Sequence, residues 1–207
     1  MNILAVASLS LAITCYGLAI FIIKNSDKKL HRLWALFNVA VGIWGTGIFL
    51  ASISSTAERA FRFWQFAHVG GCFVSVFFFH VMTIFCGLNK KRFLIFLYAQ
   101  AISLSILNLF GLAGYKVFYA FDSLYYIRAD NFVYVIFPIF LWFLPVIYGH
   151  ILLFRSYRQA SGQRRNQMKY LFASMFIGFI GGTQHFLPVY GINIYPYGNF
   201  LIVIYTI

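Results

Sequence analysis

Charge is scarce in this sequence, and acidic charge is the scarcest. Only 10% of the 207 residues are charged, and only four are Asp or Glu. A soluble globular domain is about a quarter charged and about half apolar. This chain is instead 62% hydrophobic, with a mean hydropathy of +0.82. A core of this size cannot bury so much apolar surface, so the composition excludes a protein surrounded by water and favours one that spans a lipid bilayer.

Catalytic and redox motifs are also missing. The sequence has no glycine-rich phosphate loop, no HExxH and no Ser-His-Asp set, and its three cysteines show no CxxC spacing. The four acids all fall in predicted loops or at the ends of apolar segments: Asp27, Glu58, Asp122 and Asp130. No carboxylate is therefore expected at membrane depth, where a proton-coupled transporter needs one. We expect no enzyme, no metal site and no cofactor, and a transporter is disfavoured.

Long apolar runs are abundant. Crossing about 30 Å of hydrocarbon takes about 20 helical residues, and a β-barrel would show short alternating segments instead. We predict an all-α polytopic bundle of seven transmembrane helices in one domain, residues 1–207, with the last helix incomplete. The predicted spans are 3–23, 33–53, 63–88, 93–111, 132–154, 170–192 and 199–207. The third helix is expected to begin outside the membrane near Ala57. The seventh span is too short to cross, so we expect the natural chain to continue past Ile207.

The basic residues predict the orientation. Twelve of the sixteen Lys and Arg fall near three alternate connections: Lys24, Lys28, Lys29, Arg32, Lys90, Lys91, Arg92, Arg155, Arg158, Arg164, Arg165 and Lys169. The other four, Arg59, Arg62, Lys116 and Arg128, fall on the opposite side. By the positive-inside rule, the N-terminus is extracytoplasmic and the three basic connections are cytoplasmic. The net charge of +12 is then explained by the membrane topology and by attraction of the basic residues to anionic lipid head groups. No nucleic-acid partner is expected.

Four histidines fall within the predicted spans. Counting helical turns places His68 and His185 in the outer part of the membrane, and His80 and His150 nearer the inner face. Two depth-matched pairs suit haem b ligation in principle, but His68 and His80 do not share a helix face. Hydrogen bonding within the bundle is the simpler interpretation, with haem at these four histidines as an alternative.

A candidate ligand pocket is predicted on the outer side. The loop 112–131 is rich in aromatic residues, which fits an interfacial aromatic belt or a lid over a pocket. Under the lid interpretation, the pocket for an apolar ligand is bounded by Trp64, His68, Gln184 and His185. Pro138, Pro145 and Pro188 are expected to kink helices where such a cavity opens.

Small residues are expected to let helices approach closely. They form two groups, one in the second span and one in the sixth: Gly42, Gly45 and Gly47, and Gly178, Gly181 and Gly182.

Three stretches together resemble a known family. The second span carries Asn38 and Trp44 within FNVAVGIWGTGIFLAS, and the third reads FWQFAHVGGCFVSVFFFHV. The most specific run, RRNQMKYLFASMFIGFIGGTQHFLPVYGINIYPYGNF, contains Gln167, Pro188, Pro196 and Gly198. These stretches are similar to the N-terminal seven-transmembrane sensory region of bacterial histidine kinases, a region also found ahead of diguanylate cyclase and PAS modules.

The resemblance implies a membrane-embedded sensory input module with no catalytic domain of its own. It implies a bacterial inner-membrane location, a homodimer and a cytoplasmic signalling domain in the natural chain, and it supplies no ligand. A small apolar or lipid-like ligand, or a change in the membrane, would favour one of two helix packings. The alternative from another class is a non-catalytic subunit of a larger redox or structural membrane complex, holding haem or quinone through its span histidines.

Overall fold

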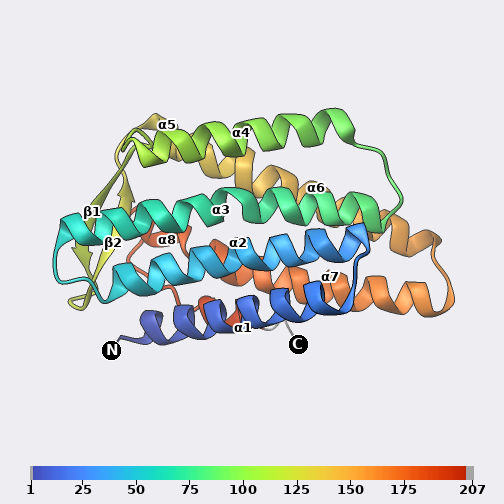
Figure 1. Ribbon diagram of the computed structural model, residues 1–207. Coiled ribbons are helices and arrows are strands. Elements are labelled where there is room, and N and C mark those ends of the chain that lie inside the picture. The colour runs from blue at the N-terminus through green and yellow to red at the C-terminus, as the bar shows by residue number, and fades with distance from the viewer. Residues whose placement is uncertain (1, 204–207) are drawn as a thin grey trace.

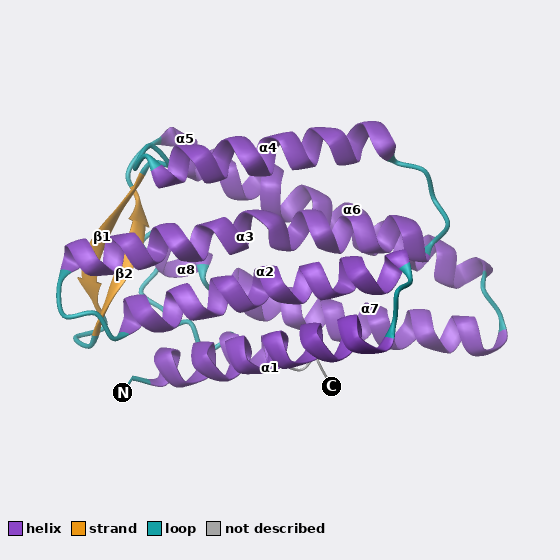
Figure 2. Ribbon diagram, viewed as in Figure 1, coloured by secondary structure: helices purple, strands orange, loops and turns teal. Residues whose placement is uncertain are grey.

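The computed structural model describes residues 2–203 of the chain, and long helices lying side by side build most of it (Figures 1 and 2). The long helices are α1 (Ile3–Asn25), α2 (Lys29–Ser52), α3 (Ala57–Phe85), α4 (Lys91–Leu109), α6 (Leu144–Gln159) and α7 (Gly162–Thr183). The short elements are β1 (Tyr115–Ala120), β2 (Leu124–Ala129), α5 (Phe132–Phe137), the π-helix η1 (Pro138–Phe143), α8 (Phe186–Val189) and α9 (Asn199–Val203). Helix α3 is central, because it packs against α2, α4, α6, η1 and both strands.

Five helical segments within residues 2–203 are long and apolar enough to cross a membrane. They are α1, α2, α3, α4 and the continuous rod of α5, η1 and α6, residues 132–159. Helix α7 has 22 residues, but three of its first eight are Arg or Lys, and it is not among the five. The first five predicted spans are therefore confirmed as apolar helices, and the third helix begins at Ala57 as predicted. The seven-span count remains a prediction, and residues 204–207 of the predicted last span lie outside the described part of the chain.

The two ends of the bundle differ in charge. The connections α1–α2, α3–α4 and α6–α7 lie at one end, while the N-terminus and the strands lie at the other (Figure 1). The first end therefore collects the twelve basic residues of the three connections. Connections rich in Lys and Arg therefore alternate along the chain with connections that contain few, which is the pattern on which the predicted orientation rests.

Glycine lets α2 and α3 approach closely. A Cβ atom on Gly47 would lie 2.5 Å from the backbone nitrogen of Ala67, and one on Gly70 would lie 2.7 Å from that of Trp44. Gly42 and Gly45 face α1 in the same way, against Tyr16 and the carbonyl of Ser8. The predicted packing role of the second-span glycines is confirmed, and it fixes α1, α2 and α3 as one tightly packed unit.

Two prolines shape the fifth span. Pro145 has no N–H, so the carbonyl of Leu141 four residues earlier lacks its usual helical donor. The Ser75 hydroxyl of α3 donates to that carbonyl. Between Pro138 and Phe143 the helix widens into a π-helix, and Trp142 in this segment is buried. The predicted distortion of this span is therefore present, and α3 satisfies the backbone group that it releases.

The segment 112–131 corrects the all-α prediction. It forms an antiparallel hairpin in which Tyr115 pairs with Ala129 and Ala120 with Leu124 (Figure 2). Phe121 and Asp122 at the tip have φ of 54° and 51°, the left-handed conformation that a tight hairpin loop requires. Aromatic and β-branched residues dominate both strands, which favours extended structure.

The predicted sixth span, 170–192, also needs correction. Its helix begins earlier, at Gly162, and ends at Thr183, after which a tight turn at Gln184 and His185 leads into α8. Pro188 explains the break, because its ring excludes the helical hydrogen bond to the carbonyl of Gln184. The turn brings His185 into the interior of the bundle, where it is buried.

Candidate functional site

A cavity with an empty volume of about 490 Å³ lies between the hairpin and the helices beneath it. Its walls come from α2, α3, β2, α5, η1, α7, α8 and the α7–α8 turn. The lining residues are Trp44, Trp64, His68, Gly71, Tyr126, Ile127, Tyr134, Phe137, Trp142, Gly182, His185, Phe186 and Val189. We call this space the hairpin pocket. Its lining is mostly aromatic and apolar, with a few polar groups at fixed positions.

Three of the four predicted pocket residues meet here. Trp64, His68 and His185 all line the hairpin pocket, although α3 and the α7–α8 turn are far apart in sequence. Gln184 is not one of the lining residues. Its side chain points toward the close approach of α7 and α9, where its Oε1 lies 2.9 Å from the position a Cβ on Gly198 would take.

The aromatic segment 112–131 contributes both to a lid over the pocket and to an exposed aromatic surface. Tyr126 and Ile127 of β2 close the pocket, and the Trp64 indole donates to the carbonyl of Tyr125 at 3.3 Å. Tyr119 and Tyr125 pack edge to face on the hairpin, with ring centroids 5.4 Å apart and Tyr119 58% exposed. Inner residues of the hairpin therefore form a lid, and outer ones have the exposure expected of an interfacial belt.

Hydrogen bonds fix the tautomer of His68. Its Nδ1 lies 2.6 Å from the carbonyl of Trp64, one turn earlier, and a carbonyl only accepts, so Nδ1 carries the proton and donates. The other ring nitrogen, Nε2, then accepts from the hydroxyl of Tyr134. The Tyr115 ring stacks on the imidazole with centroids 4.7 Å apart. His68 is thus held rigidly from β1, α3 and α5.

His185 connects the lid to the last described helix. Its Nε2 donates to the amide oxygen of Asn199, the first residue of α9. Its Nδ1 is therefore an acceptor, 2.7 Å from the hydroxyl of Tyr126, which also lies 3.0 Å from the His185 carbonyl. The Asn199 amide nitrogen donates onward to Ser8 of α1 at 2.9 Å. A chain of buried hydrogen bonds therefore runs from β2 through the pocket wall to α9 and α1.

Tyr115 and Tyr126 of the hairpin stay neutral. Burial raises the pKa of Tyr126 and of Tyr115 well above the ordinary value for a phenol. The Tyr126 hydroxyl therefore keeps its proton and remains a donor to His185.

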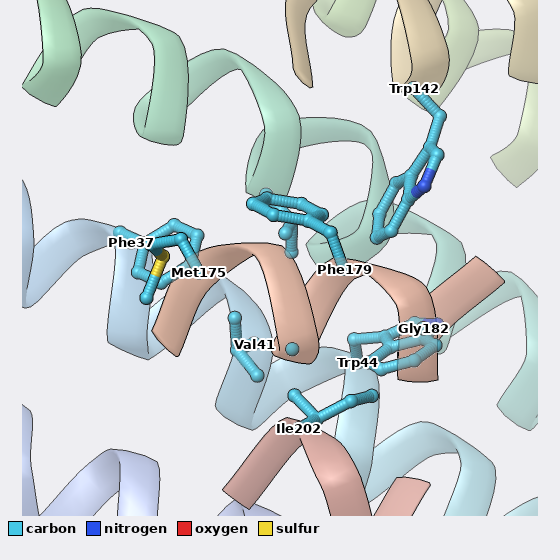
Figure 3. A pocket seen from close by; sticks show the side chains of 10 residues that line it. Phe37, Val41, Trp44, Trp142, Met175, Phe179, Gly182 and Ile202 are labelled. Atoms are coloured by element: carbon cyan, nitrogen blue, oxygen red, sulfur yellow. The ribbon is translucent and has the colours of Figure 1, made fainter. Parts of the chain in front are cut away.

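A second, smaller cavity adjoins the hairpin pocket (Figure 3). Its empty volume is about 310 Å³, and it shares Trp44, Trp142 and Gly182 with the hairpin pocket. Phe37, Met175 and Phe179 line it from α2 and α7, and Ile202 lines it from α9 (Figure 3). Helix α9 therefore touches this apolar space directly.

The four span histidines do not gather around a common centre. Both ring nitrogens of His68 and of His185 take part in hydrogen bonds, so haem ligation there would require those bonds to break. His80 bonds the hydroxyl of Tyr98 on α4, and His150 packs among phenylalanines of α3 and α7. Among the described residues no group of three His, Cys, Asp or Glu side chains is arranged to hold a metal ion.

The residues that carry the family resemblance occupy several environments. Asn38 is buried and donates to the carbonyl of Trp34, and Trp44 lines both cavities. Pro188 and Pro196 are buried, and Gly198 meets the backbone of Gly181 so closely that a Cβ at either position would clash. Gln167 is exposed on α7.

Tyr126 falls within the aromatic segment that the lid interpretation covers. The sequence did not predict a pocket or network role for Tyr134, Trp142 or Asn199. Only Asn199 left a usable signal, because it is an amide at the start of an apolar helix, where it needs a partner.

The family model described as the N-terminal 7TM region of histidine kinase matches residues 7–207. No curated protein and no solved structure matches the chain.

Proposed function

The chain belongs to the family of the N-terminal 7TM region of histidine kinase, and on this premise we propose that the hairpin pocket is the site where it receives its signal. The family region is a membrane sensory input and is not itself catalytic. In the proposed orientation, the hairpin is extracytoplasmic and the basic end is cytoplasmic. We propose further that the natural protein has seven spans in a bacterial inner membrane and acts as a homodimer with a cytoplasmic signalling domain.

The chemistry of the pocket favours a small, mainly apolar ligand. Three tryptophans with Ile127, Phe137 and Val189 supply most of the wall, the mainly apolar lining that is typical of small-molecule sites. Two histidine–tyrosine pairs provide polar groups in the wall: His68 with the Tyr134 hydroxyl and His185 with the Tyr126 hydroxyl. A ligand hydroxyl that donates to either imidazole must compete with the tyrosine hydroxyl already bonded there.

The hydrogen bond between His185 and Asn199 is the observation that carries the proposal. It joins the wall of the pocket to the first residue of α9, the helix that precedes the output domain in this family. A ligand that hydrogen-bonds to the His185 ring or to the Tyr126 hydroxyl therefore weakens the hydrogen bond between His185 and Asn199 of α9. The ligand biases α9 only as far as its affinity differs between the two packings.

A substitution that fills the pocket provides the test without a known ligand. Gly71 lines the pocket, and an added Cβ there would meet only the Trp44 ring, at 3.4 Å. Gly71→Leu therefore mimics an occupant. Gly17→Leu is the matched control, because Gly17 is exposed on α1 with no atom within 4 Å of its Cβ position.

The readout is the autophosphorylation rate, in nanodiscs, of a fusion in which the seventh span is completed to a full-length helix and then joined to a histidine kinase catalytic region. We expect Gly71→Leu to change the rate by at least about threefold, which corresponds to about 0.6 kcal/mol of bias between two packings, and Gly17→Leu to leave it unchanged. Equal rates for all three proteins would contradict the proposal.

A further inference from the structure

A groove along α6 and α7 shares no lining residue with the hairpin pocket. It runs between the η1–α6 rod and α7 and has an empty volume of about 1080 Å³. Apolar side chains line most of its length: Phe143, Val146, Ile147, Ile151, Phe154, Phe172, Phe176, Phe179 and Ile180. Its polar lining residues are Thr183 toward the hairpin end, His150 in the middle, and Arg155 and Arg158 at the basic end.

The two arginines at the basic end have no anionic partner. Neither Arg155 nor Arg158 has an ion pair or side-chain hydrogen bond within residues 2–203, and both are exposed. Neighbouring Arg164 and Arg165 are engaged, the first with the carbonyl of Phe85 and the second over the Tyr157 ring. The groove therefore ends in two free guanidinium groups, which suit a carboxylate or phosphate.

His150 supplies a second, independent feature. The residue is only 9% exposed, and its Nε2 has no hydrogen-bond partner in the described part of the chain. Its Nδ1 lies 2.8 Å from the carbonyl of Val146 and must donate to it, so the neutral ring presents Nε2 as an acceptor. A buried acceptor without a donor is costly, and this one sits among the lining residues of the groove.

The depth of His150 along α6 distinguishes a bilayer phospholipid from a ligand that carries its own hydroxyl. His150 lies five residues before Arg155, or about 7.5 Å deeper along the helix. A bilayer phospholipid that placed its phosphate at the arginines would offer only ester carbonyls at that depth, and these cannot donate. A hydroxyl on the chain of the ligand itself, close to its anionic end, would supply the missing donor. Phe172 and Phe176, which also line the groove, flank the imidazole. Because Nε2 is buried, a hydroxyl reaches it only when a flanking ring moves aside.

We propose that this groove binds a single-chain hydroxylated fatty acid. Its carboxylate would pair with Arg155 and Arg158, its hydroxyl would donate to His150 Nε2, and its alkyl chain would lie along α6 and α7. This site is separate from the hairpin pocket, and it stands or falls independently of the sensory role proposed above.

The test measures saturable binding to the purified 207-residue chain in nanodiscs of zwitterionic lipid. The probes are 3-hydroxytetradecanoic acid, tetradecanoic acid and the methyl ester of the hydroxy acid. We expect the hydroxy acid to bind about tenfold more tightly than tetradecanoic acid, the equivalent of one hydrogen bond. His150→Phe should abolish this preference, and Arg155→Gln with Arg158→Gln should weaken both acids but not the ester.

The matched control is Lys91→Gln with Arg92→Gln, which removes two charges from another basic connection and should change nothing. The comparison between the two acids on the unmodified chain needs no variant, so a folding defect in His150→Phe does not affect it. Equal affinity for the two acids, the absence of saturable binding, or displacement of the hydroxy acid by an anionic phospholipid would each overturn the proposal.

Discussion

At the scale of single residues, His185 has the most consequential position in the molecule. Its two ring nitrogens bond β2 on one side and α9 on the other, in an interior that excludes water. Hydrogen bonds between transmembrane helices contribute about 0.6 kcal/mol on average and up to about 1.7 kcal/mol. We place the His185–Asn199 bond toward the upper end, because both side chains are buried and their remaining groups are already paired.

A double-mutant cycle measures this bond. We expect His185→Ala and Asn199→Ala to show a coupling of about 1 kcal/mol in the free energy of unfolding, determined by denaturation in mixed micelles. A control cycle that pairs His185→Ala with His31→Ala should be additive, since His31 bonds Ser26 at the other end of the bundle. Additivity in the first cycle would mean that the pocket wall and α9 are not energetically linked.

The site was partly predictable at this scale. Counting turns along straight helices predicts His68 and His185 at one depth, and the structure brings both, with Trp64, to one cavity. Gln184, the fourth predicted pocket residue, does not line this cavity, because the helix ends at Thr183 and the turn points the side chains of Gln184 and His185 in different directions. Asn199 could not be paired in advance, since its partners Ser8 and His185 come from the two ends of the sequence.

At the scale of elements, two adjacent glycines of α3 lie in different environments. Gly70 lies against the backbone of α2, and Gly71 faces the hairpin pocket beside the Trp44 ring. The apolar helices themselves were predictable from hydropathy. The hairpin was not predictable from the sequence, because aromatic residues suit an interfacial belt as well as a strand and neither strand alternates in burial. The break in the sixth span was not predictable either, because a proline can kink a helix or end it.

Alanine substitutions at Gly70 and Gly71 are expected to have different effects on stability. Gly70→Ala should destabilise the protein by about 1–3 kcal/mol, because the new methyl group would overlap the backbone of α2. Gly71→Ala should change the free energy of unfolding by less than about 0.5 kcal/mol, because its methyl group would make only an ordinary van der Waals contact with the Trp44 ring, at 3.4 Å. Thermal unfolding in detergent measures both. A larger loss at Gly71 than at Gly70 would contradict the described packing.

At the scale of the whole molecule, the basic residues and the hairpin pocket lie at opposite ends of the bundle. The basic connections lie at one end with the two free arginines, and the hairpin and its pocket lie at the other (Figure 1). The positive-inside rule assigns the hairpin to the extracytoplasmic side. The sequence predicted this polarity from the connections alone, since it depends on the order of the segments and not on how they pack.

Cysteine labelling in intact cells tests that orientation. A cysteine at Asp122, on the hairpin tip, should react with a membrane-impermeant maleimide, and one at Ser161, between α6 and α7, should react only after lysis. The native cysteines are first replaced by alanine, and two of them, Cys15 and Cys72, are buried. Labelling of Ser161→Cys in intact cells would invert the proposed topology.

The central claim is that occupancy of the hairpin pocket moves α9, and a distance between spin labels measures this most directly. The labels go on cysteines at Phe200 of α9 and Ile102 of α4, which are 46% and 50% exposed. We predict that Gly71→Leu shifts the modal distance by about 1–2 Å, the scale of helix shifts in switching proteins, and that His185→Ala abolishes the shift. Identical distance distributions with the pocket open and filled would contradict the account.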